Sequence, residues 1–157
     1  MRRARQLALT FTLLAVPTLA SAQQPAGVRP HGPGNAENVP AVFTSWSAAQ
    51  SATETAQNDF HYVRDQYRAA KRAYDDLNDS GGMSTDKATK LDALRRKKDD
   101  AYRDATTKRL AYLAKAQGAV NFATKELAAA KTDADKSTAS SHKSTAQRWL
   151  DESKNGF

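Results

Sequence analysis

The stretch that decides the fold runs from residue 42 to residue 77 and reads VFTSWSAAQSATETAQNDFHYVRDQYRAAKRAYDDL. Its apolar and small residues recur in alternating steps of four and three through five heptads. The positions that share this spacing are Val42, Trp46, Ala49, Thr53, Ala56, Phe60, Val63, Tyr67, Ala70, Tyr74 and Leu77. A 3.5-residue repeat keeps one helix face against a partner helix. The spacing therefore predicts a long helix, over about residues 41–78, that packs in a coiled coil.

Bulky and small side chains alternate along this seam. Trp46, Phe60, Tyr67 and Tyr74 fill one set of positions, and alanines fill most of the other. Alternation of this kind lets two helices approach closely and interdigitate. An aromatic stripe that binds a ligand is the alternative interpretation, but side chains at a 3.5-residue period normally face a helix.

A glycine turn is expected to reverse the chain at residues 79–83, because Gly81 and Gly82 reach positive φ without strain. A second helix then follows over about residues 84–136, with Ser84 or Thr85 as its N-cap and Asp86 near its positive end. The fold class is all-α, with a long antiparallel helical hairpin. Folding the chain about this turn predicts the following neighbours: Phe60 with Tyr102, Ala49 with Leu113, and Val42 with Val120.

The seam of the second helix outruns the first helix and has to be covered. Apolar residues continue the 3,4 spacing through Leu113, Val120 and Leu127. A C-terminal helix over about residues 138–154 is expected to pack at the open end of the hairpin, after a Ser/Thr-rich link. A second copy of the chain could cover the same seam, and we expect both to contribute. Gly118, in mid-helix, marks either a bend or a close backbone approach.

The N-terminal 22 residues have the order of an export signal. Three arginines precede an apolar run over residues 7–19, and Ala20 to Ala22 supply small residues at a cleavage site. Residues 1–22 are therefore predicted to be a signal peptide cleaved near Ala22. Four prolines and three glycines in residues 23–40 predict a disordered linker, and residues 41–157 the helical domain.

The charge balance limits the partners. The chain carries 24 Lys+Arg and 17 Asp+Glu, a net charge of +7, and it has no Cys. Three basic residues and no acidic residue lie in the predicted signal, which leaves +4. Export makes nucleic acid an improbable partner, and the missing cysteines exclude disulfides and thiol chemistry. The expected location is the periplasm or the extracellular space, as a soluble protein.

Two places in the sequence partly match metal-binding patterns. Asp76, Asn78 and Ser80 match the first positions of a calcium loop, but Lys87 stands where the loop needs a bidentate glutamate. His61 lies four residues before Asp65, and a single pair of this kind is more typical of a helix surface. No catalytic spacing is recognised, so we expect no enzyme, no cofactor and no metal.

The basic run Arg95-Arg96-Lys97-Lys98 is interpreted as a solvated helix face. Acid-first pairs at i,i+4 accompany it: Asp92/Arg96, Asp99/Arg103 and Asp104/Lys108. Contact of this run with an anionic lipid or lipopolysaccharide surface stays open.

Location and shape together predict a non-catalytic coiled-coil protein that mediates assembly or binding in the bacterial cell envelope or extracellular space. The expected partners are a second copy of the chain and an envelope or exported protein. A periplasmic holdase chaperone is one alternative, and a weak metal or calcium binding protein is another. The predicted interaction seam consists of Trp46, Phe60, Tyr67, Tyr74, Leu113, Val120, Leu127 and Trp149.

Overall fold

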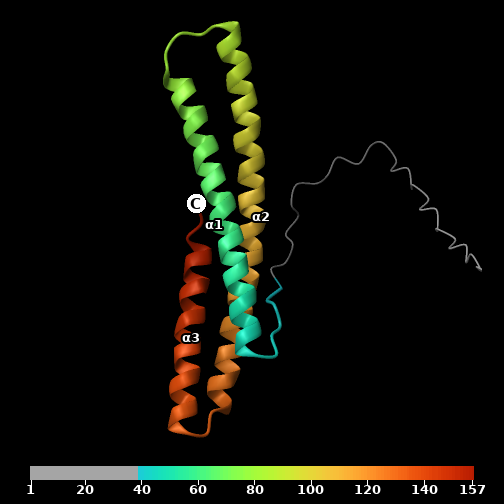
Figure 1. Ribbon diagram of the computed structural model, residues 1–157, viewed down its shortest axis with the longest axis vertical. Helices are drawn as coiled ribbons and strands as arrows, with labels where there is room; N and C mark the ends of the chain where they lie inside the picture. Colours follow the sequence, from blue (N-terminus) through green and yellow to red (C-terminus); the bar gives the residue numbers. More distant parts are fainter. Residues whose placement is uncertain (1–38) are drawn as a thin grey trace, which may run out of the picture. The chain divides into compact units, whose positions relative to one another are not determined.

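A computed structural model describes residues 39–157 (Figure 1). The predicted signal peptide and residues 23–38 of the predicted linker lie outside the described residues. The described part of the chain is all-α and contains three helices and no strand. These are α1 (Trp46–Asp79), α2 (Thr85–Ala129) and α3 (Asp133–Lys154). None of these three helices is long and apolar enough to cross a membrane.

Helix α1 begins five residues later than predicted. Ser45 is its N-cap, with extended backbone and a hydroxyl that accepts a hydrogen bond from the amide of Ala48 at 3.2 Å. The preceding segment runs along α2 instead, because the amide of Ala41 donates to the carbonyl of Ala114 at 3.1 Å. Val42 is consequently 92% exposed, and the prediction that it joins the seam beside Val120 was wrong.

The turn between α1 and α2 follows the sequence pattern. Gly81 and Gly82 have φ of 67° and 57°, as the prediction required. Ser84 is the N-cap of α2 and accepts from the amide of Lys87 at 3.1 Å, and Asp86 lies in the first turn. The Lys87 ammonium bends back and donates to the carbonyl of Gly81 at 3.0 Å.

Helices α1 and α2 run side by side in opposite directions, but in a different register from the predicted one (Figure 1). Phe60 lies against Tyr112, with ring centroids 6.2 Å apart, and Tyr102 lies against Tyr67 at 5.4 Å. The predicted pairing of Phe60 with Tyr102 was therefore wrong. The turn carries the chain beyond the end of α1 before α2 begins, and this shifts the register of α2 along α1.

Helix α3 starts earlier than predicted, and α2 ends earlier. Thr132 is the N-cap of α3, and a capping box joins it to Asp135. The Ser/Thr-rich residues 137–141, expected as a link, lie inside α3, where Ala139 is buried. The predicted bounds 84–136 and 138–154 are thus corrected to the bounds given above, because the capping box at Thr132 starts α3 within residues that the apolar spacing had assigned to the second helix.

The core lies where α3 packs beside α1 and α2, in the half of the pair away from the turn (Figure 1). Small side chains make up half of it, which lets the three helix backbones approach closely. The core residues are Ala49, Phe60, Tyr112, Ala116, Ala119, Ala146, Trp149 and Leu150. This three-helix part is called the base below, and the part of α1 and α2 over residues 66–104 is called the arm.

Candidate functional site

The predicted seam residues all lie at least partly buried between helices of this chain. Phe60 and Trp149 are buried, and the other six are half-buried. Six of the eight belong to the base: Trp46, Phe60, Leu113, Val120, Leu127 and Trp149. Tyr67 and Tyr74 extend the same stripe into the arm. Most of the seam therefore packs within one chain, and little of its surface is exposed to a partner.

A polar cluster joins all three helices at the centre of the base. The carboxylate of Glu152 on α3 accepts hydrogen bonds from Gln57 Nε2 at 2.5 Å and from the hydroxyl of Tyr112 at 3.1 Å. His61 Nε2 lies 2.6 Å from the second oxygen of Glu152. Gln57 and His61 are one turn apart on α1, so both reach the same carboxylate.

The electrostatics of this cluster favour the ionised carboxylate. Burial acts to raise the pKa of Glu152, but the hydrogen bonds from His61, Tyr112 and Gln57 outweigh it and hold the pKa below its ordinary value. Burial, together with the neighbouring Glu152 anion, raises the pKa of the Tyr112 hydroxyl far above its ordinary range. Tyr112 therefore stays a hydrogen-bond donor here, and the cluster links α3 to α1 and α2.

A second polar contact fastens the middle of α3. His142 Nδ1 lies 2.7 Å from Glu126 Oε2 on α2, and the imidazole stacks on the indole of Trp46 with centroids 4.2 Å apart. The same indole stacks on Trp149 at 5.8 Å. Trp46 therefore stacks on two side chains of α3. His142 both stacks on Trp46 and contacts Glu126, so these side chains join α3 to α1 and α2.

An aromatic cluster marks the place where the base ends and the arm begins. The ring of Phe157 lies 5.3 Å from that of Tyr67 and 5.2 Å from that of Tyr102, and it also contacts Phe60 at 6.1 Å. Tyr102 remains 48% exposed and Phe157 40% exposed. Beyond this cluster, no described residue of α3 accompanies the arm (Figure 1).

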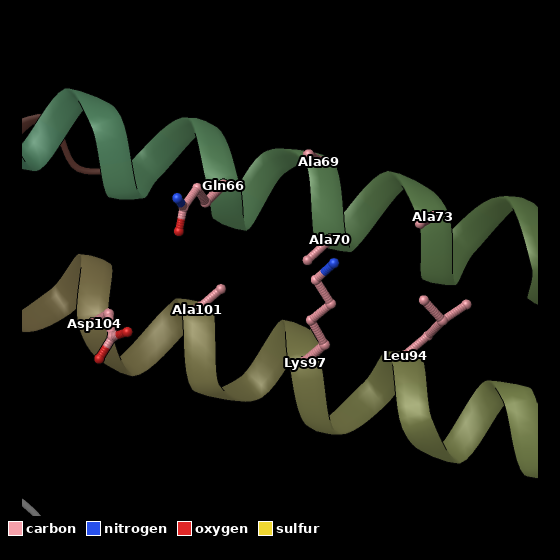
Figure 2. Close-up of a pocket in the computed structure, with 8 residues that line it drawn as sticks. All are labelled: Gln66, Ala69, Ala70, Ala73, Leu94, Lys97, Ala101 and Asp104. Atoms are coloured by element: carbon pink, nitrogen blue, oxygen red, sulfur yellow. The ribbon is translucent and has the colours of Figure 1, made fainter.

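One face of the arm carries an open groove of about 490 Å³ between α1 and α2 (Figure 2). Half of its lining residues are alanines, whose side chains are too small to fill the space between the two helices. A lysine and an aspartate from α2 stand along one edge. The lining residues are Gln66, Ala69, Ala70, Ala73, Leu94, Lys97, Ala101 and Asp104.

The basic run has ion pairs that differ from two of the three expected ones. Asp92 pairs with Arg96 at 2.8 Å as predicted, and also with Arg95. Arg103 pairs with Asp100 instead of Asp99, and Lys108 reaches across to Asp59 on α1 at 2.7 Å instead of Asp104. Lys108 pairs with the carboxylate of Asp59 on α1, so Asp104 has no ion pair within residues 39–157 and lines the groove.

The tip and His61 hold no metal cluster in the described part of the chain. No group of three or more His, Cys, Asp or Glu side chains converges among residues 39–157. At the tip, the Lys87 ammonium occupies the turn beside the carbonyls of Gly81 and Asn78. His61 faces Glu152 on α3 and not Asp65, which pairs with arginines.

Sequence reasoning missed Gln57, Glu126 and Glu152, because none of them stands on an apolar position of the heptad pattern. One signal was available. A tyrosine such as Tyr112 inside an apolar stripe needs an acceptor for its hydroxyl once it is buried, and Glu152 on the last helix supplies it. Which acid would do so depends on the register of α3, which the spacing alone does not fix.

These contacts describe a helical base fastened by polar clusters and an arm with an open face. Comparison with protein-family models, with curated proteins and with solved structures finds no match for this chain.

Proposed function

We propose that this is an exported, non-catalytic coiled-coil protein that mediates assembly or binding in the bacterial cell envelope or extracellular space, and that the arm is its binding element. In this proposal α1 and α2 form an antiparallel coiled-coil hairpin, and α3 packs at its open end. The 4,3 spacing of the seam and the burial of Phe60 and Ala49 support that arrangement.

The observation that carries the proposal is that α3 covers one half of the α1–α2 pair and not the other half. The base buries an apolar core with α3, whereas the arm has a groove on one face and, among residues 39–157, no third helix beside it. A two-helix element is at best marginally stable by its own packing, and it gains stability from a partner. The arm also carries side chains that are exposed although apolar, among them Met83 at 75%.

Export is supported by the order of charge, apolar run and small residues in residues 1–22. The intact mass of the protein isolated from cells tests it. Cleavage after Ala22 leaves a chain that begins at Gln23, recovered in the periplasmic fraction or the medium. An uncleaved chain in the cytoplasmic fraction would contradict export.

Site-specific photo-cross-linking in living cells tests the arm. A benzophenone amino acid replaces Ala69, in the groove, or Ser140, which is exposed on α3. We expect adducts of defined mass from position 69 and none from position 140, whether the captured molecule is a second copy or another protein. Adducts from position 140 alone, or from neither position, would remove the arm as the binding element.

A holdase chaperone is the second candidate, and the aromatic cluster at the root of the arm favours it. Tyr102 and Phe157 are each about half exposed, and Tyr62 is 67% exposed, so unfolded apolar segments have rings to contact. Suppressed aggregation of an unfolded outer-membrane protein at near-stoichiometric ratio supports this candidate. No suppression at about tenfold excess rules it out.

A further inference from the structure

We propose that the alanine groove of the arm binds the same groove of a second copy of the chain, with the two arms antiparallel about a two-fold axis that passes near Ala101. The inference rests on the proposed function, since it assigns a partner to the arm. It names a surface of this chain that the seam prediction did not contain.

The groove is shaped for a close helix-to-helix approach. Ala70 on α1 and Ala101 on α2 point into the space between the two helices, whereas Ala69 and Ala73 are exposed on the α1 side of the groove (Figure 2). Small residues at such positions let two helix pairs pack with short interaxial distances. Leu94 lines the end of the groove nearest the turn. In a dimer its side chain would pack against the second copy.

A second apolar stripe on α1 leads into this groove. Tyr62, Gln66, Ala69 and Ala73 repeat at steps of four, three and four, on a different side of the helix from the seam of Phe60 and Tyr67. Tyr62 is 67% exposed, and no packing within residues 39–157 accounts for its ring. With α2 shifted along α1 as observed, the antiparallel arrangement brings Tyr62 of each copy level with Leu94 of the other.

The charges along the edge of the groove are self-complementary. Lys97 and Asp104 are seven residues apart, so they lie on one face of α2 and ~10 Å apart along its axis. Within residues 39–157 neither side chain has an ion-pair partner, although most neighbouring charges do. An axis midway between them sets each Lys97 opposite the Asp104 of the other copy.

This pattern selects a second copy over other occupants of the groove. In an isologous interface, residue i of one copy contacts residue j of the other, and j contacts i in turn. A groove with Lys97 and Asp104 placed symmetrically about its centre would therefore form two identical ion pairs with a second copy. A parallel arrangement would instead oppose Lys97 to Lys97 and Asp104 to Asp104, which is unfavourable. An anionic lipid surface fits poorly, since Asp104 would face it.

Exchanging the two charges tests the inference on the full chain. Sedimentation equilibrium of the wild type is expected to give a dimer. Lys97→Asp alone opposes two acids at both ends of the interface, and Asp104→Lys alone opposes two cations. Each single variant is expected to weaken dimerisation at least ~10-fold. The double variant Lys97→Asp with Asp104→Lys restores the pairs, and we expect its dimerisation constant within about threefold of the wild type.

Controls separate this interface from misfolding and from the proposed function. Lys143→Asp makes the same charge change on an exposed position of α3, and it is expected to leave the dimer intact. Ala69→Arg places a long side chain in the groove from a position exposed in the single chain, and it is expected to yield a folded monomer by circular dichroism. A monomeric wild type, or single charge variants that dimerise normally, would overturn the inference. If position 69 still cross-links to another protein in cells, the proposed function survives that result.

Discussion

His61 on α1 and Glu152 on α3 are joined by a contact of 2.6 Å between Nε2 and Oε1, and they stand 91 residues apart in the sequence. The same carboxylate accepts from Gln57 on α1 and from Tyr112 on α2. One side chain of α3 is therefore bonded to both other helices. The base is the part of α1 and α2 that α3 covers, and the Glu152 carboxylate attaches α3 to that part.

Replacing Glu152 with glutamine is expected to destabilise the base. The amide keeps the shape but loses the charge that strengthens three hydrogen bonds, so the free energy of unfolding should fall by about 1 kcal/mol at neutral pH. Urea denaturation followed by circular dichroism measures it. The control is Asp151→Asn, one residue earlier, whose exposed carboxylate bonds only within α3 and whose loss should cost less than about 0.5 kcal/mol. Equal losses for the two variants would show that the cluster does not fasten α3.

Acidification is expected to remove the same contribution. The pKa of Glu152 is lowered from its ordinary 4.5 in the folded protein, so the folded state binds fewer protons than the unfolded state. Its contribution is complete above pH 4.5 and is lost as the pH falls through the lower folded pKa. The difference in unfolding free energy between wild type and Glu152→Gln should therefore shrink below pH 4.5. A difference that grows on acidification would contradict this assignment.

Removing the indole of Trp46 is expected to loosen the packing of α3 against α1. The ring is stacked between His142 and Trp149. Since it is half-buried, Trp46→Ala should cost about 2 to 3 kcal/mol, less than a fully buried tryptophan. Trp46→Phe, which keeps an aromatic face, should cost roughly half as much. The fluorescence of Trp149 should shift to the red in the alanine variant, and an unchanged emission maximum would count against the stack.

Gly118→Ala is expected to detach the segment before α1 without unfolding α2. A Cβ on residue 118 would lie 2.2 Å from the carbonyl oxygen of Ala41, a backbone atom that cannot turn aside. The segment must move, and the hydrogen bond from Ala41 to Ala114 is lost with it. Alanine meanwhile favours the helix by about 1 kcal/mol.

Hydrogen exchange resolved by residue distinguishes this from a general effect. The amide of Ala41 should lose protection in Gly118→Ala, while the amides of α2 keep theirs. Gln117→Ala changes the neighbouring, half-buried position and should leave the amide of Ala41 protected. Full protection of Ala41 in Gly118→Ala would mean that the close approach does not exist.

Local rules in the sequence predicted the turn between α1 and α2 and the N-cap of α2. Gly81 and Gly82 have the positive φ that a tight reversal requires, and Ser84 caps α2 as its side chain chemistry favours. Gly118 marks a close backbone approach, one of the two expected reasons for glycine in mid-helix. The turn and the cap depend on a few neighbouring residues, whereas the close approach at Gly118 involves Ala41 and Phe43, which are distant in the sequence.

Register and partner choice could not be predicted in the same way. The 4,3 spacing alone does not fix how far one helix slides along the other, so it did not predict Tyr112 as the neighbour of Phe60. The predicted seam of α2 ran through Leu113 and Val120, whereas the buried stripe runs through Tyr112, Ala116 and Ala119. The polar cluster at Glu152 depends on that register and on the position of α3, and the end of α2 depends on a capping box at Thr132 hidden in a polar run.

Hydrogen exchange along the whole chain tests most directly the claim that α3 covers the base and leaves the arm without cover. The measurement is made in dilute solution, below the concentration at which copies associate. Amides of α1 and α2 in the base should exchange as slowly as those of the buried face of α3, and amides over residues 66–104 should exchange markedly faster, because local opening follows the loss of buried apolar contacts. Uniform protection along both helices, from the base to the tip, would contradict the account.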